Sequence, residues 1–114
     1  MARVLKQLVS NDQIAGVADS DTDELYAAGT NTGLVTAASA YNGHGSAVVL
    51  SVYILPESVT AASVDPVAVI SIPNGETALI SDLLGHVIPP NGTLEAFAGT
   101  TNVIRVTVTG VEIS

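Results

Sequence analysis

Apolar and polar residues alternate along much of this chain with the period of two that is typical of β-strands. In Val103–Ile113 the even positions from 104 to 108 are apolar, and the odd positions between them are Arg or Thr. In Ser46–Ile54 the alternation leaves both faces fairly apolar, as in a strand that is covered on both sides. Other short runs are also expected to be strands: Leu25-Tyr26, Gly33–Tyr41, Val67–Ile72, Thr77–Leu84 and Thr93–Phe97.

The alternation reverses near the C-terminus. After Gly110 the odd positions Val111 and Ile113 are apolar, whereas the even position Glu112 is polar. One extra residue in a strand exchanges its two faces, so we expect a β-bulge at Gly110.

Turn-forming sequences separate the expected strands, among them Asn42-Gly43, Pro73-Asn74-Gly75 and Pro89-Pro90-Asn91-Gly92. Strands recur roughly every 8 to 12 residues, and no long helical pattern is present. The sequence therefore predicts an all-β fold, a single antiparallel β-sandwich that is jelly-roll-like, with Glu57–Asp65 as a long exposed loop.

The N-terminal segment does not follow this rhythm. Its apolar residues fit one face of a short amphipathic helix, and they fit an edge strand or an extended arm equally well. Asn11–Glu24, which follows, is polar and acidic and resembles a linker. We therefore expect residues 1–24 to be an N-terminal arm and acidic linker, and residues 25–114 to be the β-sandwich domain. Apolar residues beyond a linker should be buried against a neighbouring subunit, so the arm is expected to dock there through Arg3, Val4, Leu5, Lys6, Leu8 and Val9.

Composition narrows the class of protein. The 114 residues suffice for one domain, and 47% hydrophobic with only 12% charged residues is unlike a disordered chain. No apolar run approaches the roughly 20 residues of a membrane-spanning helix. The absence of cysteine excludes disulfides, thiolate zinc sites and cysteine nucleophiles. Three bases and a net charge of -8 leave too few cations for binding nucleic acid.

Few side chains suggest chemistry. The acidic run Asp19–Glu24 begins like a calcium loop, but Glu24 and Thr30 stand where such a loop needs Gly and Glu. A solvated acidic turn is the favoured interpretation, and an ion site is the alternative. His44 and His86 lie in turns without the spacing of metal ligands. We expect no catalytic residue, no metal and no cofactor, and hence not an enzyme.

Several segments resemble the small β-sandwich virion proteins of tailed bacteriophages. The shared patterns are a turn of the form I-x-x-G-E-T, a segment I-x-x-N-G-T-L-x-A and a closing strand V-x-V-T-G-V-E-I. The central strand and the opening residues resemble that family as well. In this chain the matching segments are Ile72–Thr77, Val87–Ala96, Val106–Ile113, Val48–Pro56 and Arg3–Leu8.

The resemblance implies a structural virion protein on the capsid surface, most directly a capsid cement or decoration protein that stabilises the capsid. Its partners would be the major capsid protein and further copies of itself, in a homo-oligomer for which a trimer is one arrangement, with no nucleic acid or membrane. The alternatives are a tail or neck decoration protein and a host-glycan binding module. A glycan binder should expose Tyr26, Tyr41 or Tyr53 in a groove, whereas a cement protein should bury them in the core or at interfaces.

Overall fold

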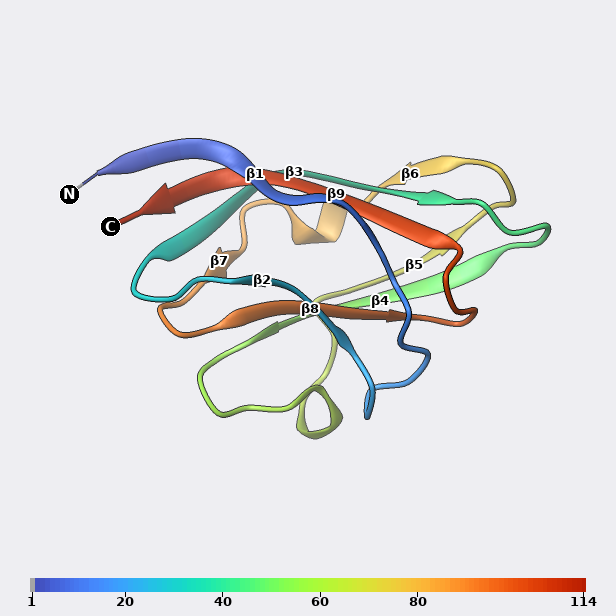
Figure 1. The fold of residues 1–114 in the computed structure, drawn as a ribbon, viewed down its shortest axis with the longest axis horizontal. Coiled ribbons are helices and arrows are strands. Elements are labelled where there is room, and N and C mark those ends of the chain that lie inside the picture. The colour runs from blue at the N-terminus through green and yellow to red at the C-terminus, as the bar shows by residue number, and fades with distance from the viewer. Residues whose placement is uncertain (1) are drawn as a thin grey trace.

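Two antiparallel sheets pack face to face in the computed structural model, which describes residues 2–114 (Figure 1). The first sheet has the strand order β1-β9-β3-β6, with β7 also paired to β3, and the second has the order β2-β8-β4-β5. The strands are β1 (Arg3–Gln13), β2 (Asp23–Ala27), β3 (Thr32–Asn42), β4 (Val48–Leu55), β5 (Ala68–Ile72), β6 (Thr77–Leu79), β7 (Val87–Ile88), β8 (Thr93–Ala98) and β9 (Ile104–Ile113). No helix among the described residues is long and apolar enough to cross a membrane.

Strands pair from the middle of the chain outward, so that each earlier strand pairs with a later one. β4 pairs with β5, β3 with β6 and β7, β2 with β8, and β1 with β9, all of them antiparallel. Because β6 and β7 pair with successive parts of β3, they act as one interrupted edge strand. The chain is therefore a long double ribbon rolled into two sheets, which is the jelly-roll arrangement. The expected all-β sandwich is confirmed.

The space between the sheets is filled almost entirely by aliphatic side chains, and Tyr26 is the one aromatic member of this buried cluster. Its largest fully buried members include Ile14, Leu50, Ile72, Ile80, Leu83, Ile88, Leu94 and Ile104. A second, smaller cluster of Tyr53, Leu55 and Ala61 lies on the outer face of β4, where the β4–β5 connection folds over it. The loop expected at Glu57–Asp65 is thus mostly exposed, but Ala61 at its centre is buried.

The sequence located most strands to within a few residues, and its main error lies between β5 and β8. The run Thr77–Leu84 is a strand only as far as Leu79, after which a short 3₁₀ helix, η2 (Ser81–Leu83), turns Leu83 into the core. Strand β7, which follows, was not expected. The apolar side chains of this segment do not alternate strictly, because it follows the sheet edge with a helical turn in the middle.

The helical interpretation of the N-terminal segment is wrong, since residues 3–13 form the edge strand β1. The following residues pack more tightly than a linker would: Ile14 is fully buried, and its amide donates to the Ile104 carbonyl at 2.9 Å. The amides of Ala15 and Gly16 both donate to the Asp23 carboxylate, at 2.6 and 3.1 Å. The acidic segment therefore has an internal structural use at Asp23.

The bulge expected in β9 at Gly110 is not there; the irregularities lie in the neighbouring strands β1 and β3. Strand β9 keeps its register throughout, while β1 and β3 each carry one extra residue beside Gly110, Leu8 and Thr36 respectively. Both bulged strands crowd this point, because a Cβ at position 110 would lie 2.2 Å from the Leu34 carbonyl oxygen and 2.7 Å from Leu8 Cδ1. Glycine is required here by the close approach of backbone. Because β9 does not change phase, Glu112 still points toward the interior side.

We expect Gly110→Ala to lower the free energy of unfolding by about 2–4 kcal/mol, since the methyl group meets backbone that cannot move aside. Gly45→Ala is the matched control, because a Cβ there has no heavy atom within 4 Å. Urea unfolding of the two variants measures the difference. Equal losses would show that crowding at Gly110 is relieved by small shifts.

Asn42 is the fully buried polar residue at the end of β3. Its Nδ2 donates to the carbonyls of Ser46 at 2.9 Å and Ile72 at 2.8 Å, and its Oδ1 accepts from the His44 amide at 2.8 Å. One side chain thus joins the β3–β4 turn to the end of β5. Because every polar atom is paired, the residue fixes the turn without an unmatched buried group.

Asn42→Ala should cost about 2–3 kcal/mol of stability, because it removes three hydrogen bonds and leaves their partners at a buried site. Asn74→Ala is the control, since Asn74 is exposed and lies in a neighbouring turn. Thermal and urea unfolding of both variants test this. A loss for Asn42→Ala no larger than that of the control would show that water replaces the amide.

Candidate functional site

The structure separates the six residues expected to dock onto a partner. Leu8 and Val9 are buried in the protein's own core, at 8% and 1% exposure, while Val4 and Leu5 are exposed at 52% and 73%. Arg3 is exposed, and Lys6 Nζ lies 3.2 Å from Glu112 Oε1. The free apolar surface of this segment is therefore limited to its first residues.

Leu5 belongs to an apolar row that crosses the outer face of the first sheet. In the strand register Leu5 is opposite Val111, Val111 is opposite Leu34, and Leu34 is opposite Val87. Directly opposed residues project from the same face, so the four side chains form one continuous row over β1, β9, β3 and β7. Leu5 and Val87 are exposed, and Leu34 and Val111 are half-buried.

Two more exposed leucines extend this surface along the β6–β7 edge. Leu79 on β6 is 75% exposed and is opposite Ser39 on the outer face, and Leu84 in the η2–β7 connection is 46% exposed. We call the six residues Leu5, Leu34, Leu79, Leu84, Val87 and Val111 the apolar face. Scattered surface leucines are ordinary, but a connected set that spans a sheet marks an interaction surface.

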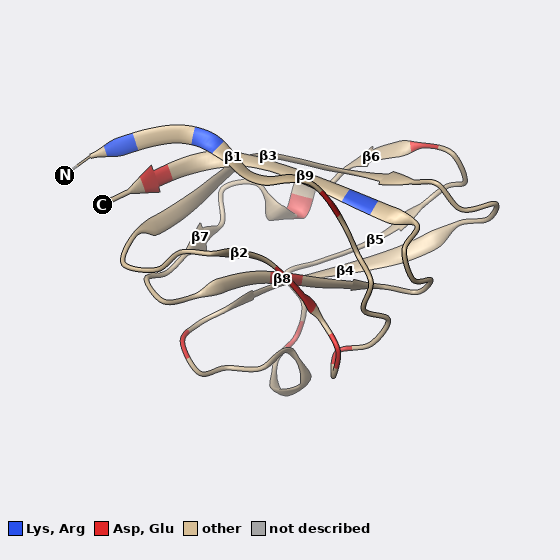
Figure 2. Cartoon of the chain, viewed as in Figure 1, with Lys and Arg blue, Asp and Glu red and all other residues tan. Residues whose placement is uncertain are grey.

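Charge is divided unevenly between the two sheets (Figure 2). The first sheet and its connections carry all three bases and four acids, a formal charge of -1. The second sheet and its connections carry the remaining seven acids and none of the bases, a formal charge of -7. The acids of the second group are Asp19, Asp21, Asp23, Glu24, Glu57, Asp65 and Glu95. The apolar face therefore lies on the nearly neutral side of the molecule.

A polar cluster joins the two sheets at the end that holds the chain termini. Tyr26 Oη on β2 donates to Glu112 Oε2 on β9 at 2.5 Å, and Lys6 Nζ on β1 donates to Glu112 Oε1 at 3.2 Å. Burial and the adjacent carboxylate raise the pKa of the Tyr26 hydroxyl, so this group stays a hydrogen-bond donor. The Tyr26 hydroxyl and, to a lesser extent, Lys6 lower the pKa of Glu112.

Because the pKa of Glu112 is lower in the folded state, its ionised form contributes stability above the unfolded pKa, and that stability is lost as pH falls through the folded pKa. We expect Glu112→Gln to reduce the melting temperature at about pH 7 and to have less effect at about pH 3. Glu57→Gln, which changes an exposed acid of the β4–β5 connection, is the control. The same difference at both pH values would mean that the charge of Glu112 contributes nothing.

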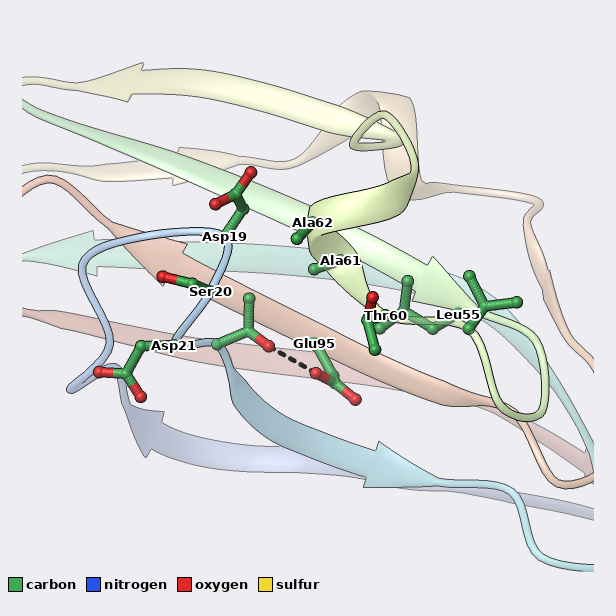
Figure 3. Close-up of a pocket in the computed structure, with 10 residues that line it drawn as sticks. Asp19, Ser20, Asp21, Leu55, Thr60, Ala61, Ala62 and Glu95 are labelled. Atoms are coloured by element: carbon green, nitrogen blue, oxygen red, sulfur yellow. Dashed lines mark hydrogen bonds between the residues drawn. The ribbon is translucent and has the colours of Figure 1, made fainter.

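A hollow of about 480 Å³ lies on the outer face of the second sheet, between the turn at residues 19–22 and the β4–β5 connection (Figure 3). Acidic and hydroxyl side chains line one side of it, and Leu55, Val59, Ala61 and Ala62 line the other. Both Glu95 oxygens are already engaged, one by Thr22 Oγ1 at 2.5 Å and one by Thr93 Oγ1 at 2.7 Å. The Thr22 bond is the dashed line in Figure 3.

The acidic run is dispersed by the fold. Asp23 turns inward to the amides of residues 15 and 16, while Asp19 and Asp21 border the hollow. Within residues 2–114, no three carboxylate or imidazole groups are close enough together to hold a metal ion. The expectation that this segment is a solvated acidic turn stays a prediction.

The remaining candidate residues do not converge on one place. His44 lies in the β3–β4 turn, where its amide is bound by Asn42, and His86 is exposed beside β7. Of the tyrosines, Tyr26 and Tyr53 are buried, whereas Tyr41 is 44% exposed on the outer face of β3. None of the three lines the hollow.

In comparisons with known proteins, no family model, no curated protein and no solved structure matches this chain.

Sequence reasoning identified part of the apolar face and missed the rest. Leu5 was among the expected docking residues, and Val87 lies in a segment that was not recognised as a strand. Val111 was expected to face inward after a bulge in β9. Leu79 and Leu84 could have been predicted to be exposed only if the 3₁₀ helix η2 between them had been recognised in the sequence.

Proposed function

We propose that this chain is a structural virion protein of the capsid cement or decoration class, and that it attaches to the major capsid protein through the apolar face of its first sheet. The observation that carries the proposal is the row Leu5–Val111–Leu34–Val87, with Leu79 and Leu84 beside it. Enzyme and glycan-binding module have the least support, because the two histidines lie in separate connections and none of the three tyrosines lines the hollow.

The chemistry of the apolar face suits permanent attachment to another protein. Burying an exposed Leu or Val contributes roughly 1.5 kcal/mol or more, so the side chains of the apolar face together offset much of the roughly 4–15 kcal/mol that association costs. Arg105 and Arg3 share the outer parity of this face, and Arg105 is opposite Tyr41 in the register. The surface therefore has an apolar row with guanidinium groups at its rim, the composition enriched in protein interfaces.

The distribution of charge supports the same orientation. The side with a formal charge of -7 would face solvent, where acidic groups maintain solubility and keep neighbouring particles apart. The side with a formal charge of -1 would face the capsid, where burying few charges costs little desolvation. The sequence resemblance to phage virion proteins points to the same class of partner.

Attachment is tested with capsids that lack this protein. We expect Leu5→Glu and Val87→Glu each to reduce binding about tenfold or more, because each places an unpaired carboxylate in a desolvated interface. Both positions are exposed, so the melting temperature should change little. Co-sedimentation of purified variants with the capsids measures the binding.

Val64→Glu is the control, since Val64 is 40% exposed in the β4–β5 connection, away from the apolar face. It should bind capsids like the parent protein. Undiminished binding by both Leu5→Glu and Val87→Glu would contradict attachment through this face. Binding to purified tails and not to capsids would contradict the capsid as the partner.

A further inference from the structure

Three of the four sheet edges are built in ways that discourage pairing with another strand. Edge strand β1 has two register shifts, and β2 has one shift and two acids in only five residues. The edge formed by β6 and β7 is broken by η2 into pieces of three and two residues. Irregularity, charge and short length are the usual protections of an exposed edge.

The fourth edge, strand β5, is as short as β2 but has neither irregularity nor charge. Its five residues, Ala68–Ile72, pair with β4 in unbroken register and include no charge, no proline and no glycine. Val69 is 53% exposed, Ser71 is exposed, and no other strand in residues 2–114 pairs with the outer side of β5. A regular, uncharged edge of this kind is a template for strand addition.

The direction of the peptide groups on β5 follows from two hydrogen bonds of β4. The Val49 carbonyl accepts from Gly99, beyond β8, at 3.0 Å, and the Val52 carbonyl accepts from Val67, on the β5 side, at 2.8 Å. Peptide groups alternate in direction along a strand, so the odd residues of β4 point away from β5. Their register partners Val69 and Ser71 consequently direct their own N–H and C=O groups outward.

We infer that β5 pairs antiparallel with β5 of a second copy of this chain, about a two-fold axis at Ile70. In that register Val69 is opposite Ser71 of the partner subunit, and the outward N–H and C=O groups of both residues are paired. The two four-stranded sheets become one continuous sheet of eight strands. Val49 and Val69 of both copies then project from the same outer face of the joined sheet.

The outward groups of Val69 and Ser71 are self-complementary about a two-fold axis, and β5 is the strand edge where a second copy meets the least charge repulsion. The protein carries a net charge of -8, and seven acids belong to the second sheet and its connections, so most contacts between two copies would be repulsive. The β5 edge is the uncharged strand edge of that sheet, and pairing it with itself opposes no like charges. An isologous contact of this kind closes as a dimer and does not propagate.

The proposed symmetry has a geometric consequence. A two-fold axis that relates antiparallel neighbours in one sheet is perpendicular to the sheet, so both first sheets lie on the same side of the joined sheet. Both apolar faces would then point in one direction and could meet one surface together, which raises avidity. The inference itself does not depend on capsid attachment, because it concerns the protein alone in solution.

The register makes a charge-exchange test possible. Val69→Glu/Ser71→Glu places glutamate opposite glutamate at both positions of the dimer, and Val69→Lys/Ser71→Lys places lysine opposite lysine. We expect the parent protein to be a dimer by sedimentation velocity, and each variant alone to self-associate about tenfold or more weakly. An equimolar mixture of the two variants should restore a dimer, because each glutamate then meets a lysine.

Ala62→Glu/Val64→Glu is the matched control, with the same spacing and added charge at exposed positions of the β4–β5 connection, outside the apolar face. It should remain a dimer, and melting curves confirm that each variant is folded. The inference is overturned if the parent protein is a monomer at all concentrations, if it is a trimer, or if the glutamate pair on β5 associates like the parent. A mixture that stays monomeric would also contradict it.

Cross-linking tests the register without adding charge. The chain has no cysteine, so Ile70→Cys introduces a single thiol, which the two-fold axis places opposite its own copy. We expect oxidation to give a disulfide-linked dimer from Ile70→Cys and little from Val69→Cys, whose side chain is diagonal to its own copy. Equal cross-linking of the two variants would show random collision and contradict the register.

Discussion

Strand β9 is the element on which the first sheet depends, because it is paired along both sides and receives β1 and β3 at their bulges. At position 110 this pairing on both sides permits only glycine, since the Leu34 carbonyl occupies the space that a side chain would need. Because both bulges lie in the neighbours, β9 passes through the crowded point without changing phase. Glu112 therefore stays on the interior side, where Tyr26 reaches it from the second sheet. The hydrogen bond between the sheets is a consequence of the glycine two residues earlier.

The same pairing determines which surfaces the molecule offers. Since β9 holds β1 against the sheet, Leu8 and Val9 join the core, and only Val4 and Leu5 remain exposed from the N-terminal segment. Leu5 then extends a row that begins at the opposite edge with Val87. An interaction surface expected on a mobile arm is therefore part of a rigid sheet, and docking through it requires no ordering of the chain. That arrangement would suit the attachment to a capsid protein that we propose.

The edges of the sandwich show how unequal the strands are in their readiness to pair. Bulges, acids and a helical turn interrupt three edges, whereas β5 is regular and uncharged. A chain with only 12% charged residues has few charges with which to protect its edges, and only β2 among the four edges has more than one acid. The readiness of β5 to pair with another strand is therefore inferred from its difference from the other three edges and not from its own sequence alone.

The alternation of apolar and polar residues by itself determined the fold class and located seven of the nine strands, because strand formation at β4 or β9 is expressed in adjacent residues. It could not separate helix from edge strand at Arg3–Gln13, where the partner is a hundred residues away in sequence. Nor could it place the irregularities beside Gly110, since a bulge is defined by register between strands and either neighbour can absorb the extra residue.

The apolar face was likewise determined partly by sequence and partly by tertiary structure. Each of its residues is visibly apolar in the sequence, but only tertiary structure aligned Leu5, Val111, Leu34 and Val87, because that alignment is a property of four strands brought together from both ends of the chain.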